Sequence, residues 1–176
     1  SSASVSASEG AGGGLIGTNQ DAGTVTKCYA TGQVSSYSHA AGLVAENSGT
    51  ISDCYSRSQA TATKNTAGGL VASNSGVVRN CYSTGRVSAP SRVGGLVGVG
   101  GGASVTGSFW DRQTSGQAAS AGGMGKTTAE MKQAATFAGW DFVWTWTIQR
   151  GVDYPRLKWE ADPFPAPVPT TIEKVS

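Results

Sequence analysis

The sequence predicts an all-β fold: a right-handed parallel β-solenoid of about four coils, with a C-terminal helix-plus-strand cap and a Pro-rich tail. Three observations predict it. The chain repeats with a period close to 27 residues, it is rich in glycine and poor in charge, and the repeat stops after Gly116. We therefore divide the 176 residues into repeats (1–116), a capping segment (117–160) and an extended tail (161–176).

The repeat is clearest in AGLVAENSGTISDCYS at 41–56 and GGLVASNSGVVRNCYS at 68–83. An earlier copy at 13–30 is two residues longer, and a decayed copy at 94–110 has lost its cysteine. Two sets of residues mark the period, namely Leu15, Leu43, Leu70 and Leu96, and Cys28, Cys54 and Cys81. A period of this length predicts one solenoid coil per copy.

Each copy holds short apolar segments of strand length, bounded by Gly, Asn or Ser turn signals. One copy cannot bury its apolar face alone, but stacked copies can, with equivalent strands paired about 4.8 Å apart. Like side chains then form ladders, and we expect the leucine and cysteine ladders to point inward. Asn19, Asn47 and Asn74 mark a predicted tight turn, where stacked asparagines also hydrogen-bond. The handedness follows from the rule for parallel crossovers.

Composition excludes several classes of partner. Charged residues are 14% of the chain, against about a quarter in ordinary proteins. The net charge of +2 is too small to indicate nucleic acid or an acidic membrane. No apolar run is long enough to span a membrane. The chain begins with Ser, and we expect a processed product or an excised fragment.

The capping segment differs from the repeats. TTAEMKQAATFAGW (127–140) predicts one short helix, with Thr127 and Glu130 at capping-box spacing and Gly139 at its end. All five tryptophans lie between 110 and 159. We expect the helix and the aromatic residues to seal the open end of the solenoid. The tail, ADPFPAPVPTTIEKVS, predicts an extended polyproline-like spacer.

AGGMGKTT at 121–128 resembles the phosphate loop of ParA-like ATPases in all but its leading lysine. The GxxxxGK spacing needs a glycine where Ser120 stands, and no buried strand precedes the loop. We therefore interpret the stretch as a glycine turn that delivers Thr127 as a helix cap. No nucleotide or other cofactor is expected.

For the other candidate site residues, the sequence favours a structural role over catalysis or metal binding. Three cysteines cannot all pair, and no CxxC spacing indicates a metal, so we interpret Cys28, Cys54 and Cys81 as buried thiols. His39, the one histidine, is expected in an exposed turn. Asp141, Asp153 and Glu130 could supply a carboxylate pair for sugar hydrolysis, but the repeats hold almost no further acids. We expect no enzyme.

An aromatic residue follows each cysteine position: Tyr29, Tyr55, Tyr82 and Phe109. If the cysteines point inward, strand alternation points these rings outward. They could form an exposed stripe that stacks on sugars or on a partner. The alternative is a corner tyrosine tucked into a turn.

The stretch GGLVASNSGVVRNCYSTGRV and its companions resemble the GLUG repeat, named for its Gly-Leu-(any)-Gly core. That repeat occurs in bacterial surface proteins, including filamentous haemagglutinin-like adhesins, and beside the protease region of immunoglobulin A1-protease-like metallopeptidases. The repeats carry the resemblance over roughly residues 1–116. The closing segment extends it to about residue 159. No HExxH motif is present, so protease activity is excluded from this chain.

The resemblance implies a structural or adhesive module of a secreted or cell-surface bacterial protein, which contacts partners through the solenoid surface. Those partners would be other protein subunits, or host or surface glycans and proteins. The alternative is an extracellular filament subunit, a homo-polymer joined head to tail through its open N-terminal face and its tail. A polysaccharide-acting β-helix enzyme is the third possibility.

Overall fold

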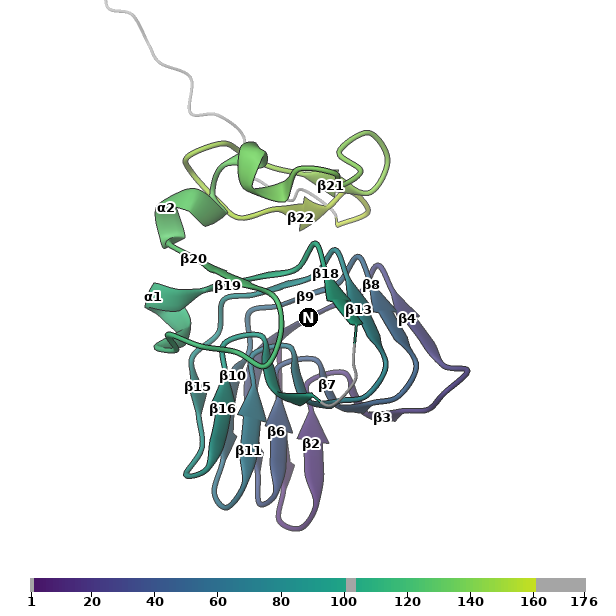
Figure 1. Cartoon of the computed structure of the whole chain (residues 1–176), viewed down its shortest axis with the longest axis vertical. Helices are drawn as coiled ribbons and strands as arrows, with labels where there is room; N and C mark the ends of the chain where they lie inside the picture. Colours follow the sequence, from purple (N-terminus) through teal and green to yellow (C-terminus); the bar gives the residue numbers. More distant parts are fainter. Residues whose placement is uncertain (1, 101–103, 161–176) are drawn as a thin grey trace, which may run out of the picture.

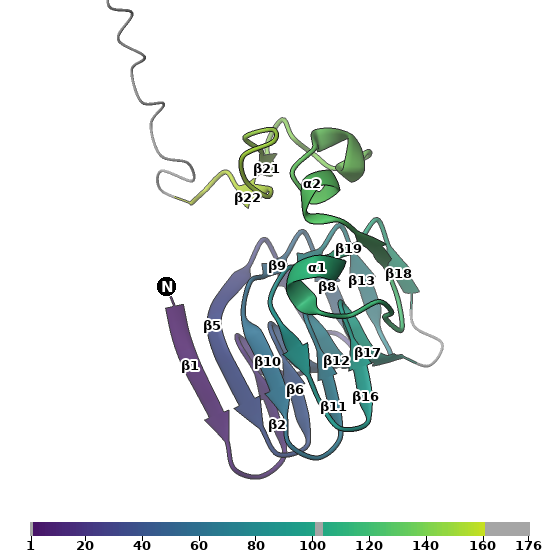
Figure 2. The ribbon, with the colours of Figure 1, turned by 90° about the vertical axis from the view of Figure 1, so that its left-hand side faces the viewer.

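Each repeat folds into one coil of a parallel β-solenoid, because its apolar segments become strands and its Gly, Asn and Ser residues become turns (Figure 1). The computed structural model describes residues 2–100 and 104–160. About four coils stack in register, which confirms the predicted fold class. The chain winds counterclockwise in Figure 1 as it advances toward the viewer, and Figure 2 shows this advance from the side. The coil is therefore right-handed.

Five stacks of parallel strands form the walls, and the long β5 belongs to two of them. The first stack contains β1 (Ser2–Ala7), β5 (Tyr29–Ser36), β10 (Gln59–Ala62) and β15 (Val87–Ser88). The second contains β2 (Ala11–Gly13), β6 (His39–Ala41), β11 (Thr66–Gly68) and β16 (Arg92–Gly94). The third contains β3 (Ile16–Asn19), β7 (Val44–Asn47), β12 (Val71–Asn74) and β17 (Val97–Gly100).

The fourth stack contains β4 (Thr24–Thr26), β8 (Thr50–Ser52), β13 (Val77–Arg79) and β18 (Ser104–Thr106). The fifth starts at Tyr29 in β5 and continues through β9 (Tyr55–Ser56), β14 (Tyr82–Ser83), β19 (Phe109–Asp111) and β20 (Met124–Lys126). Among the described residues, β2, β3 and β4 each have a partner on one side alone. The first coil therefore presents unpaired strand edges.

Ladders of like residues fill the interior. Leu43, Leu70 and Leu96 are fully buried. Leu15, in register with Leu43, is 46% exposed because no described coil lies over the first one, so the burial of the leucine ladder ends at the open face. The cysteines differ in burial for the same reason. Cys54 and Cys81 lie in inner coils and are buried, whereas Cys28 lies in the first coil and is half-buried.

Asparagines form a second ladder at the predicted turn. Asn19 Nδ2 donates to Asn47 Oδ1 at 2.7 Å, and Asn47 Nδ2 donates to Asn74 Oδ1 at 2.7 Å. All three side chains are buried and out of reach of water. Each amide–amide bond therefore replaces a hydrogen bond to water that the buried amide has lost. The ladder ties the first three coils together.

The segment after the repeats contains α1 (Arg112–Ser115), α2 (Thr128–Met131), the 3₁₀-helix η1 (Ala134–Phe137), β21 (Trp146–Thr147) and β22 (Arg156–Leu157). The prediction of one helix over 127–140 is wrong, since α2 and η1 are separate. The Thr136 hydroxyl donates to Glu130 O at 2.6 Å, and Gln133 is extended. The Glu130 carbonyl therefore accepts a side-chain hydroxyl at the point where a continuous α-helix would run on.

This segment does not seal the end of the solenoid as expected. From α2 onward it forms a cap that lies against the side of the coils, over the fifth stack (Figures 1 and 2). Residues 117–123 instead cross the C-terminal end, where Gly95 N donates to Ala119 O and Ala121 N donates to Val97 O. The predicted tail, residues 161–176, lies outside the described residues.

Candidate functional site

The aromatic residues after the cysteine positions form one continuous column. The rings of Tyr29, Tyr55 and Tyr82 stack with neighbouring centroids 5.0 Å apart and planes tilted by 6°. Phe109 follows in register with Tyr82. Tyr55, Tyr82 and Phe109 are buried and Tyr29 is half-buried, so the expectation of an exposed stripe is wrong for the first three. Their rings point out of the solenoid, as alternation requires, but the cap covers them.

The cap reaches all four coils along this column. Trp159 packs on Tyr29 in the first coil, at 5.7 Å between ring centroids. The Tyr55 hydroxyl donates to the Glu160 carboxylate at 3.0 Å, and the Tyr82 hydroxyl donates to Pro155 O at 2.5 Å. Phe137 meets the Phe109 ring edge-on at 5.3 Å. The cap therefore acts as a brace across the stack.

Two polar side chains, the half-buried Arg57 and the buried Asp111, join the cap to the coils. Arg57 pairs with Asp153 of the cap at 3.5 Å and lies over the rings of Tyr55 and Tyr154. Asp111 is fully buried and accepts bonds from the Thr128 hydroxyl at 2.6 Å and the Tyr154 hydroxyl at 2.7 Å.

Neither anchor was predicted from the sequence. Arg57 carried a signal, because the equivalent positions in the neighbouring copies are Thr31 and Thr84. A single arginine at a threonine position indicates a partner specific to that coil. Asp111 carried no comparable signal.

Burial controls the ionisation of the column. It raises the pKa of Tyr55 and of Tyr82 far above the ordinary value, and raises the pKa of Tyr154 to about 12. Burial opposes ionisation of Asp153 as well, but bonds from Arg156 and the charge of Arg57 hold its pKa below the usual value. The interface thus keeps its phenols neutral and its carboxylate charged.

The glycine-rich stretch at 121–128 packs and pairs with the last coil of the solenoid. Met124 N donates to Ser108 O, and β20 pairs with β19. A Cβ on Gly123, whose φ is +87°, would come within 2.6 Å of Leu96 Cδ2, so the glycine permits close crossing over the core. Thr127 and Glu130 form the predicted capping box. The amides of Ala121, Met124, Thr127 and Thr128 each donate to a group of the protein itself.

The three thiols are free and lie in adjacent coils. Cys28 N donates to Cys54 Sγ at 3.4 Å, and each thiol donates to the carbonyl two residues before it at 3.1 Å. Burial raises the pKa of Cys28 and of Cys81, whereas a bond from Cys81 lowers the pKa of Cys54. Their place in the core is that of small apolar residues.

The carboxylates singled out in the sequence each hold local structure. Glu130 caps α2, Asp141 accepts the amides of a turn, and Asp153 pairs with two arginines. His39 Nδ1 lies 3.1 Å from the Ser38 hydroxyl and 3.7 Å from Glu46. No group of three or more His, Cys, Asp or Glu side chains that could hold a metal occurs within residues 2–100 and 104–160.

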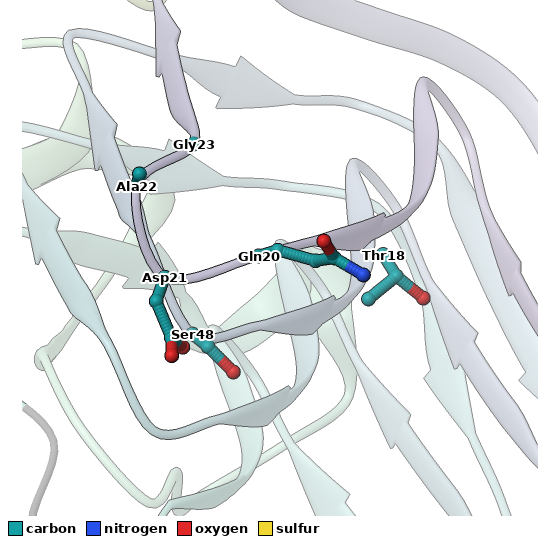
Figure 3. A pocket seen from close by; sticks show the side chains of 6 residues that line it. All are labelled: Thr18, Gln20, Asp21, Ala22, Gly23 and Ser48. Atoms are coloured by element: carbon teal, nitrogen blue, oxygen red, sulfur yellow. The ribbon is translucent and has the colours of Figure 1, made fainter.

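Two hollows of the described residues are candidate binding sites. One, of about 700 Å³, is open and lies where the first copy has its two extra residues, between Thr18, Asp21 and Ser48 (Figure 3). It offers a single carboxylate. The other, of about 300 Å³, lies in the cap, where Phe142, Ile148, Arg150 and Lys158 line it. It combines apolar walls with two cations.

Comparison with known proteins supports the resemblance. The model of the GLUG motif matches residues 8–35 and 65–88, so two stretches of the repeat region are similar to the GLUG motif. The chain is 48% identical over 71 residues to a protein of Evansella cellulosilytica named "Putative Gly-rich membrane protein". That match covers 37% of this chain and 8% of the relative's length. No solved structure matches. In the described part of this chain, no helix has the length and apolar character to cross a bilayer.

Proposed function

We propose that the chain is a non-catalytic structural module of a bacterial cell-surface protein, a stiff spacer that makes contacts through its walls. One observation carries the proposal: the cap braces all four coils through the aromatic column. In contrast, the candidate catalytic groups are dispersed and engaged in local structure. GLUG motifs and the Gly-rich relative support a surface location.

Single-molecule pulling through the two ends tests the spacer role. A braced stack should resist extension and then rupture in one main event, because the cap must leave before the coils separate. Stepwise unravelling at low force would contradict a load-bearing role. Release of sugars in a polysaccharide-cleavage screen would contradict the non-catalytic part.

A filament subunit is the second candidate, favoured by the unpaired edges of β2, β3 and β4 and by the exposure of Leu15. The opposite end is crossed by residues 117–123, so equivalent coils cannot stack there without moving this segment. Electron microscopy of the concentrated chain decides between the two. Filaments would support the second candidate, and dispersed particles would contradict it.

A further inference from the structure

The most exposed large apolar side chains of the described residues gather at one end of the cap. Trp144 is 81% exposed, Val143 65% and Trp159 59%. In the antiparallel pair β21–β22, Trp146 lies opposite Leu157, and Lys158 N donates to Thr145 O. The same register, continued by one residue, brings Trp144 and Trp159 to the same end of the pair. We call Val143, Trp144 and Trp159 the tryptophan tip.

The backbone of the tip is firmly held. Asp141 Oδ1 accepts the amides of Val143 at 3.0 Å and of Trp144 at 2.9 Å, and Thr145 donates its hydroxyl to Oδ2. The Trp159 indole donates to Lys27 O at 3.0 Å. The turn thus presents Val143 and Trp144 to solvent in a fixed arrangement, although burying them would have stabilised the fold.

Two lysines lie beside the tip. Lys158 Nζ donates to Val143 O at 2.8 Å, the Trp159 indole bonds the backbone oxygen of Lys27, and the charge of Lys27 acts on Asp141. Arg150 and Lys158 line the neighbouring hollow. The salt bridges of the described residues include none of Lys27, Arg150 and Lys158. Two carboxylates lie beside the tip, and both are engaged: Asp141 accepts bonds from its own turn, and Glu160 accepts from the Tyr55 hydroxyl and the Leu157 amide.

We propose that the tryptophan tip is an interfacial anchor that docks the cap on an anionic lipid surface. Tryptophan prefers the boundary between headgroups and acyl chains, and lysine and arginine are attracted to anionic headgroups. An exposed apolar tip with lysines beside it has this combination of properties. A sugar-stacking site would instead need free acceptors as well as donors around the ring; the lysines supply donors alone, and the Asp141 oxygens are engaged by their own turn. The net charge of +2 makes this attraction local and sensitive to salt.

Vesicle co-sedimentation of the full chain tests the anchor. We expect binding to vesicles that contain phosphatidylglycerol, weaker binding to pure phosphatidylcholine, and loss of affinity at 0.5 M salt, a condition of about 4 Å Debye length. Trp144 and Trp159 are exposed whereas Trp110, Trp140 and Trp146 are at most 6% exposed, so a blue shift of the fluorescence reports insertion of the tip.

The variant V143S/W144S should bind at least about tenfold more weakly, because both side chains lose their apolar contact with the bilayer. Lys158→Gln should weaken binding about fivefold. Val77→Ser, which removes a 36% exposed valine from β13, is the matched control and should bind as the parent does. Circular dichroism checks that each variant is folded.

Three outcomes would overturn the proposal: no binding to phosphatidylglycerol vesicles, equal binding by V143S/W144S and the parent, or binding that persists unchanged in high salt. Retention on a sulfated polysaccharide, without vesicle binding, would assign the tip to a glycan instead. The spacer role rests on the coils and the brace, so it survives each of these results.

Discussion

One residue before each cysteine position, the backbone turns into the left-handed region. Lys27, Asp53 and Asn80 have φ of 51°, 53° and 51°, and Gly107 has φ of 52° at the same place in the fourth coil. Asparagine and aspartate tolerate this conformation, whereas a lysine pays a steric cost of about 1–2 kcal/mol. The fourth coil shows that glycine fits the turn.

Lys27→Gly should therefore raise the free energy of unfolding by about 1 kcal/mol, after the extra chain entropy of glycine is subtracted. Urea denaturation followed by circular dichroism measures it. Lys27→Ala removes the same ammonium group but keeps a Cβ, so it should give no gain. Equal stability of the two variants would show that the turn is unstrained.

Asn47 occupies the middle of the asparagine ladder. It accepts from Asn19, and it donates to Asn74 and to Gly49 O at 3.2 Å. Asn47→Ala leaves buried partners on both sides unsatisfied, so we expect a loss of about 2–4 kcal/mol of unfolding free energy. Ser48→Ala, an exposed neighbour, should change it by less than about 0.5 kcal/mol. Similar losses in both variants would contradict a structural role for the ladder.

At the scale of the elements, the aromatic column and the cap form one interface that depends on neutral phenols. The folded-state pKa of Tyr55, Tyr82 and Tyr154 lies above the unfolded value of about 10. A raised folded-state pKa gives a stability contribution that is present below pH 10, and is lost as pH rises through the folded-state value. The cap should therefore detach in alkali before the ladders inside the coils fail.

A spectrophotometric titration at 295 nm, combined with near-ultraviolet circular dichroism, measures this detachment. Of the five tyrosines, three should ionise only above about pH 11, together with the loss of aromatic dichroism. Tyr82→Phe removes one late phenol and its bond to Pro155. Ionisation of all five near pH 10 with unchanged dichroism would contradict the neutral interface.

The parts of this interface show what a sequence pattern can predict. The solenoid follows from the repeat, because the period alone fixes which residues pair between coils. Strand alternation also gave the right direction for Tyr55 and Tyr82, outward from the core. Their burial depends on Glu160 and Pro155, which lie 105 and 73 residues away, and no local period reports such contacts. The split of the 127–140 helix is local, but the apolar pattern does not report it either, since Gln133 is extended and the Thr136 hydroxyl bonds Glu130 O.

At the scale of the whole molecule, the cap opposes fraying from the first coil. In a stack where coils contact their neighbours alone, an end coil with one neighbour unfolds first. The first coil has unpaired edges at β2, β3 and β4, yet Trp159 of the cap packs on its Tyr29 and bonds Lys27 O. A contact between the cap and the first coil thus makes unfolding more cooperative than a simple stack would allow.

Trp159→Ala should release the first coil without unfolding the rest, because the bonds of Glu160, Pro155 and Phe137 to the later coils remain. Hydrogen exchange should then quicken in residues 11–36 by about tenfold or more, as expected for the loss of a packed indole and its hydrogen bond. Trp144→Ala is the matched control, since it removes the same side chain from the same cap without any contact to the coils. If both variants exchange alike in the first coil, the cap does not brace it, and the resistance of that coil has to come from the ladders alone.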